Sequence, residues 1–182
     1  MTLFNDRFRV ASTRLKGWDY SSTGYYFVTI CTRERQCWLG GVVDGFIRLS
    51  PVGEIAEKFW GEIPSHSSGV DLDEFVVMPN HLHGIVIIKD CRRDVACNVS
   101  ANSNEMSAIS PKEGSLGAVI RSYKSAVSNW CRKHSYDFAW QPRFFDEIIR
   151  DEKSLEVIRE YICNNPLKWE LDKDNPANYG RG

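Results

Sequence analysis

The chain has 182 residues, 42% of them hydrophobic and 26% charged, and its 23 Lys and Arg face 24 Asp and Glu for a net charge of −1. These fractions exclude a disordered or membrane-embedded chain and indicate one domain over residues 1–182, large enough to bury a core. A charge near zero gives no overall attraction to nucleic acid, although local basic patches can supply one.

Six cysteines are scattered along the chain: Cys31, Cys37, Cys91, Cys97, Cys131 and Cys163. They form no Cys-x-x-Cys pair and no zinc-ribbon spacing. No N-terminal signal pattern and no apolar run near 18 residues is visible. We therefore expect a reduced, cytoplasmic protein with no membrane attachment.

The first third of the chain predicts an arm, a strand, a hairpin and a helix. Residues 1–23 are polar and rich in Arg and Lys, which indicates a basic arm that is either simply solvated or touches a phosphate backbone. Residues 25–32 are aromatic and β-branched and predict a strand. Asp44-Gly45, between two apolar pairs, predicts a tight type I′ hairpin turn. Ser50-Pro51 starts a helix that we expect Pro64 to end, with Ile55 and Phe59 in its apolar stripe and a loop over residues 65–68.

Two apolar strands follow, at residues 70–78 and 81–88, and two histidines open the second one. Successive side chains of a strand alternate between faces, so His81 and His83 share one face, about 7 Å apart along the strand. Two neutral imidazoles at this spacing suit a divalent first-row metal ion. The alternative is a pair of imidazoles on a half-exposed strand that bond to local groups.

A polar segment and a helix come next. Residues 90–114 shift to polar and small residues, with Ser and Asn prominent, and predict a long surface loop. Residues 115–133 predict the clearest helix, which has no carboxylate. Arg121 and Lys124 lie on a face that could follow phosphates, and an ordinary solvated face is the alternative.

The C-terminal part predicts a strand and a last helix. Residues 143–150 predict a final strand or extended segment, and the acidic turn at residues 151–154 starts a helix. We expect Tyr161 in the buried stripe of this helix, Pro166 at its end and a polar tail over residues 169–182. Tyr161 and Asn165 are at i and i+4, so they share a helix face. An amide oxygen can complete a hard-ion site, and a phenol beside it can act as a nucleophile.

The element order strand, helix, strand, strand, helix, strand is typical of a ferredoxin-like α+β sandwich. The sequence therefore predicts a central antiparallel sheet with an extra N-terminal hairpin and an added C-terminal helix.

Residues 77–83 resemble the His-hydrophobe-His motif of the HUH single-strand nucleases. Four further blocks, in this order along the chain, are similar to one branch of these enzymes: residues 25–32, 140–146, 149–152 and 161–168. That branch is the REP-associated tyrosine transposases, relatives of the single-tyrosine transposases of small bacterial insertion sequences.

This resemblance, which runs from about residue 25 to residue 168, implies roles for single residues. His81 and His83 match the metal-binding pair. Tyr161, on the C-terminal catalytic helix, matches the nucleophile that forms a phosphotyrosyl bond with DNA. Asn165 stands where the insertion-sequence relatives carry a glutamine that completes the metal site. The implied ion is Mg²⁺ or Mn²⁺.

The implied activity is a metal-dependent endonuclease and strand transferase that cleaves single-stranded, hairpin-containing DNA through a 5′-phosphotyrosyl intermediate. Arg143 and Arg150, in the block before the tyrosine helix, are candidates for DNA contacts beside Arg121 and Lys124. Relatives of this kind occur both as monomers and as homodimers, and either state fits. Two alternatives stay open: a domesticated hairpin-binding protein without turnover, and a metal-dependent phosphoesterase that uses water.

Overall fold

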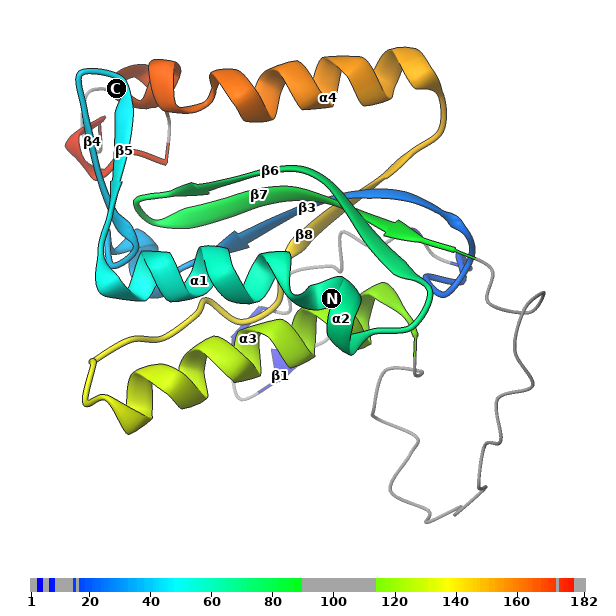
Figure 1. Cartoon of the computed structure of the whole chain (residues 1–182), viewed down its shortest axis with the longest axis horizontal. Coiled ribbons are helices and arrows are strands. Elements are labelled where there is room, and N and C mark those ends of the chain that lie inside the picture. Colours follow the sequence, from blue (N-terminus) through cyan, green and yellow to red (C-terminus); the bar gives the residue numbers. More distant parts are fainter. Residues whose placement is uncertain are drawn as a thin grey trace.

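A computed structural model of the chain describes residues 3–4, 7–8, 15, 17–89, 114–172 and 174–178 (Figure 1). About half of the predicted basic arm and nearly all of the predicted loop over residues 90–114 lie outside these described residues. Within them, no helix combines the length and apolar character needed to cross a membrane. No disulfide joins the four cysteines that the structure describes, which are Cys31, Cys37, Cys131 and Cys163.

The centre of the fold is a four-stranded antiparallel sheet in the order β6-β7-β3-β8. Its strands are β3 (Gly24–Cys31), β6 (Val70–Met78), β7 (His81–Ile88) and β8 (Phe145–Ile149). The first and third strands pair in the middle, while the second and fourth take the edges. This is the strand order of a ferredoxin-like sandwich, so the predicted fold class is confirmed.

Helices cover both faces of the sheet (Figure 1). Helices α1 (Pro51–Gly61) and α3 (Leu116–Lys133) lie on one face, and α4 (Glu152–Asn164) crosses the other. Alternating strand residues divide between these layers, as period-two strands require. Tyr26, Val28 and Ile30 belong to the larger core with α1 and α3, whereas Phe27 and Ile85 pack with α4.

Two smaller hairpins flank the sandwich. Strands β1 (Leu3–Phe4) and β2 (Arg7–Phe8) pair with each other, and so do β4 (Gly40–Val43) and β5 (Phe46–Leu49). Asp44 and Gly45 both have positive φ, at 52° and 75°. A type I′ turn requires positive φ at both central residues, so the predicted hairpin turn is confirmed.

The first helix differs in detail from its prediction. It ends at Gly61, and Pro64 lies in the first turn of a second short helix, α2 (Ile63–His66), where the missing N–H of proline costs no hydrogen bond. The expected loop at residues 65–68 is therefore partly helical. The deepest residues of α1 are Val52, Ala56 and Trp60, while Ile55 and Phe59 are only half-buried at the edge of the stripe.

The predicted tail is wrong over its described residues, because they pack as two 3-10 helices, η3 (Pro166–Leu171) and η4 (Pro176–Asn178). Pro166 opens η3 and Trp169 is buried. Polar side chains bond to backbone carbonyls here: Asn178 Nδ2 donates to the oxygens of Glu170 and Asp172 at 2.8 and 2.9 Å. The segment is therefore ordered although its composition is polar.

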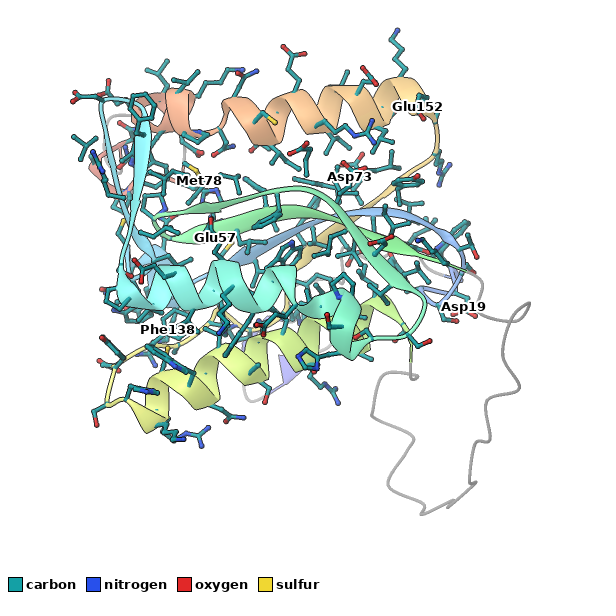
Figure 2. All side chains as sticks on the ribbon, in the orientation of Figure 1. Asp19, Glu57, Asp73, Met78, Phe138 and Glu152 are labelled. Atoms are coloured by element: carbon teal, nitrogen blue, oxygen red, sulfur yellow. The ribbon has the colours of Figure 1, made fainter. Side chains whose placement is uncertain are left out.

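Helix α4 is held against the sheet by a fork-shaped ion pair as well as by its apolar stripe. Asp73 projects from β6 toward α4 (Figure 2), and its two carboxylate oxygens accept from Nε and Nη2 of Arg159 at 2.9 and 2.7 Å. Bidentate pairs of this kind fix orientation as well as distance. The same helix carries Tyr161, so this contact positions the candidate site.

Candidate active site

Strand β7 places His81 and His83 on the face that α4 covers. Both side chains are buried, with exposed fractions of 0% and 4%, and their ring centroids lie 4.5 Å apart in an edge-to-face arrangement. The half-exposed strand that the sequence left as an alternative is therefore wrong. Buried polar rings need partners, and each nitrogen of the pair can be followed in turn.

Both nitrogens of His83 have a side-chain partner. Its Nδ1 lies 2.8 Å from Oγ1 of Thr29, the residue opposite it on β3, and its Nε2 lies 3.2 Å from the hydroxyl oxygen of Tyr161. Phe27 stacks on the ring with 5.4 Å between centroids. The ring is thus held between the sheet and helix α4.

His81 has one bonded and one open nitrogen. Its Nδ1 lies 2.8 Å from Oδ1 of Asn80, and its buried Nε2 bonds to no residue that the structure describes. Burial, helped by the charge of Arg35, lowers the pKa of His81 to about 3. The imidazole is therefore neutral near pH 7, which is the form that binds metal ions.

Tyr161 and Asn165 follow each other by one helical turn at the end of α4. Tyr161 is 42% exposed, so its predicted place in the buried stripe is wrong: its ring meets Phe27 edge-on and keeps one side open to solvent. Burial of its inner part raises the pKa of Tyr161 above the ordinary 10, against a lowering hydrogen bond with Asn165. Asn165 itself is buried, and its Oδ1 accepts no hydrogen bond from the described residues.

Two buried acceptor atoms without a hydrogen-bond donor in the described part of the chain fit the predicted metal site. Nε2 of His81 and Oδ1 of Asn165 are buried acceptors without a donor among the described residues, and such atoms are costly unless something binds them. The described residues contain no group of three His, Cys, Asp or Glu side chains that could hold a metal ion. A metal site here would therefore depend on the amide oxygen of Asn165 beside the two imidazoles.

The four predicted DNA-contacting residues lie outside β7 and α4, the two elements that carry this cluster. Arg121 and Lys124 are on α3, on the opposite side of the sheet from α4, and Arg121 is exposed. Lys124 donates to the carbonyl oxygens of Gln141 and Arg143 at 2.7 and 2.8 Å, and burial lowers its pKa to about 8. Its ammonium group therefore holds the loop before β8, which disfavours a phosphate contact. Arg143 and Arg150 are exposed on either side of β8.

Three neighbours of the site were not predicted from the sequence. Thr29 faces His83 only because of the β3–β7 register, and Trp169, whose ring lies 6.1 Å from that of His81, sits in the supposed tail. Asn80 follows Pro79 in the turn between β6 and β7. Its place directly before a candidate metal-binding histidine was the one signal that could have pointed to it.

Known proteins are similar to this chain in sequence and in fold. No family model matches the chain. A Haemophilus influenzae protein known only as an uncharacterized protein is 38% identical over 167 residues, which are 89% of this chain and 91% of that protein. A second protein of that species, named "Putative REP-associated tyrosine transposase", is 24% identical over 162 residues, 87% of this chain and 80% of its own length.

A solved structure is also similar. It is that of a REP-associated tyrosine transposase bound to a REP hairpin, with a TM-score of 0.59 and 19% identity, over 90% of this chain and 77% of that chain. The likeness shows that the two chains share a fold.

Proposed function

We propose that this chain cleaves and rejoins single-stranded hairpin DNA. The chain belongs to one family with the Haemophilus influenzae protein that is 38% identical to it, and it resembles the REP-associated tyrosine transposases. The observation that carries the proposal is the hydroxyl of Tyr161, partly exposed and 3.2 Å from Nε2 of His83. A nucleophile that solvent can reach thus lies against a buried imidazole pair. The structural neighbour was solved with a REP hairpin, which supports hairpin DNA as the substrate class.

The proposed reaction uses Tyr161 as the nucleophile. Its phenolic oxygen attacks the scissile phosphorus, the bond from phosphorus to the 3′-oxygen breaks, and that oxygen leaves as a 3′-hydroxyl. The product is a 5′-phosphotyrosyl bond between DNA and protein, so the energy of the broken bond is kept. Attack by the 3′-hydroxyl of another strand reverses the step and joins DNA without a nucleotide cofactor.

Two features of Tyr161 bear on its reactivity. Burial raises the pKa of its phenol, so the hydroxyl is protonated at neutral pH and a poor nucleophile by itself. A side-chain hydrogen bond from Asn165, one turn away, acts in the opposite direction and lowers that pKa. Tyr161 is therefore positioned for attack but needs further activation.

A divalent ion, Mg²⁺ or Mn²⁺, held by His81, His83 and Asn165 would supply that activation by polarising the phosphate and stabilising negative charge on oxygen. Two imidazole nitrogens and an amide oxygen are a neutral donor set, which leaves the full charge of the ion for the phosphate. Both His81 and Asn165 offer a buried acceptor atom for this purpose.

The test is a cleavage assay on a single-stranded hairpin oligonucleotide in the presence of Mn²⁺. We expect a covalent protein–DNA adduct that resists denaturation with the wild type and none with Tyr161→Phe. His81→Ala should also abolish the adduct. Loss of cleavage in His81→Ala together with full cleavage by Tyr161→Phe would instead identify a phosphoesterase that uses water. Hairpin binding without any cleavage, at all metal concentrations, would identify a binding protein.

A further inference from the structure

Asn80 occupies the turn between β6 and β7, directly before His81, and is fully buried. Its amide nitrogen donates to two backbone carbonyls from distant parts of the chain, those of Arg35 at 2.9 Å and Asp174 at 2.6 Å. Its amide oxygen lies 2.8 Å from Nδ1 of His81. The side chain thus uses both ends of the amide.

These contacts determine which way the amide points. A primary amide nitrogen has two protons, and the two carbonyls take both of them. The opposite orientation would place the amide oxygen against two carbonyl oxygens, which cannot donate. Oδ1 of Asn80 therefore faces His81, and because Oδ1 can only accept, Nδ1 of His81 must be the donor.

The backbone around Asn80 is held as firmly as the side chain. Thr32 N–H donates to the carbonyl oxygen of Asn80, and Leu39 N–H donates to that of Pro79, both at 2.9 Å. The side chains of Arg35 and Asp174, whose carbonyls bind the amide, form an ion pair at 2.6 Å. The orientation of the Asn80 amide is therefore fixed by Arg35, in the segment before β4, and by Asp174, in the C-terminal segment.

We propose that Asn80 is a positioning residue that keeps His81 in the tautomer with its proton on Nδ1, so that the lone pair on Nε2 points into the candidate site. A donor at Nε2 would leave two acceptors, Nδ1 and Oδ1 of Asn80, facing each other at hydrogen-bond distance. A tautomer fixed through the outer nitrogen is the usual way in which proteins prepare a histidine for a metal ion. The use of that lone pair for metal rests on the function proposed above, whereas the tautomer itself does not.

The tautomer can be read without metal or DNA. In the metal-free protein with ¹⁵N-labelled histidines, two-dimensional NMR correlates each ring nitrogen with the ring carbon-bound protons and separates protonated from bare nitrogens. The signals of His81 are those that disappear in His81→Gln. We expect Nδ1 of His81 to be protonated and Nε2 to be bare in the wild type. A wild-type His81 protonated on Nε2 alone would overturn the proposal.

Two variants show whether Asn80 is the cause. Asn80→Ala removes the acceptor, so Nε2–H should become populated in His81. Asn178→Ala is the matched control, because it also removes an amide that donates to two backbone carbonyls but touches no histidine. The proposal is wrong if Asn80→Ala leaves His81 entirely in the Nδ1–H form. If Asn80→Ala does not fold, the wild type still decides, since a His81 without a proton on Nδ1 contradicts the proposal.

A titration with Mn²⁺, followed by electron paramagnetic resonance, separates this inference from the proposed function. We expect Asn80→Ala to bind Mn²⁺ about 10–100-fold more weakly than the wild type, the usual effect of losing the partner of a ligating histidine. Asn178→Ala should bind as the wild type does. A wild type that shows the Nδ1–H form but does not bind Mn²⁺ would refute the proposed metal site and leave the role of Asn80 in the tautomer intact.

Discussion

The hydroxyl oxygen of Tyr161 lies 3.2 Å from Nε2 of His83, across 78 residues of sequence, and joins the last helix to the second strand of the β6–β7 pair. Nδ1 of His83 is already bonded to Thr29, so Nε2 is the nitrogen that remains for a ligand. An imidazole nitrogen has a single lone pair. A metal ion on Nε2 would therefore replace the hydrogen bond between this nitrogen and the hydroxyl of Tyr161.

This replacement predicts the metal affinity of a variant without the hydroxyl. Tyr161→Phe removes the hydrogen bond to Nε2 of His83, and because such a bond contributes about 1 kcal/mol, Mn²⁺ should bind up to about fivefold more tightly. Calorimetric titration of both proteins measures the difference. A marked loss of Mn²⁺ affinity in Tyr161→Phe would show that the hydroxyl is itself a ligand, contrary to its assignment as the nucleophile.

Asn165 is expected to matter for the metal rather than for the fold. Its Oδ1 accepts no hydrogen bond within the described part of the chain, so Asn165→Ala removes an acceptor that stabilises nothing else there. We expect Mn²⁺ affinity to fall about tenfold or more, by analogy with the cost of weakened metal shells. Asn164→Ala, one residue earlier on α4, is the control and should bind Mn²⁺ normally. Equal affinities in the two variants would remove Asn165 from the site.

The ion pair that holds α4 predicts a pH dependence of stability. Hydrogen bonds from Arg159 lower the pKa of Asp73 below the ordinary 3.8. A carboxyl with a depressed pKa in the folded state stabilises the protein fully above its unfolded pKa, and this stabilisation is lost as pH falls through the folded value. Denaturant unfolding at a series of pH values should therefore show the wild type losing its advantage over Asp73→Asn below about pH 4. A constant difference between the two proteins down to lower pH would contradict this assignment.

Any side chain added at Gly84 is expected to destabilise the core. A Cβ atom at this position would lie 2.5 Å from Cζ2 of Trp60, an aromatic ring in the packed layer between β7 and α1. Gly84→Ala should lower the free energy of unfolding by about 1–3 kcal/mol, as overpacking does. Gly61→Ala is the control, because a Cβ there would meet nothing within 4 Å. Equal unfolding free energies for the two variants would show that Trp60 can move aside.

Substitutions of Arg121 and Lys124 should have different effects, one on the affinity for hairpin DNA and the other on the free energy of unfolding. Lys124→Met removes two hydrogen bonds to the carbonyls of Gln141 and Arg143, and we expect a loss of about 1–2 kcal/mol in unfolding free energy with little change in hairpin affinity. Arg121→Met should leave stability unchanged. If Arg121 touches a phosphate, hairpin affinity falls and its salt dependence decreases by about 1 in slope. Hairpin binding that depends on Lys124 and not on Arg121 would reverse both assignments.

Much of the architecture could be predicted because it depends on short-range patterns. The alternation of His81, His83 and Ile85 placed these side chains on one strand face, and the four-residue spacing of Tyr161 and Asn165 placed them on one helix face. The dipeptide Asp44-Gly45 likewise predicted its own turn. Each of these follows from backbone geometry within a few residues, which the sequence alone determines.

Only the tertiary structure decided which polar groups meet. The register between β3 and β7 brings Thr29 to His83, and the fold of residues 166–178 brings the carbonyl of Asp174 to the amide of Asn80. The composition of that last segment indicated a solvated tail, because Asn and Asp side chains bond equally well to water and to buried carbonyls. The choice between these partners depends on segments about a hundred residues apart, and no local pattern contains it.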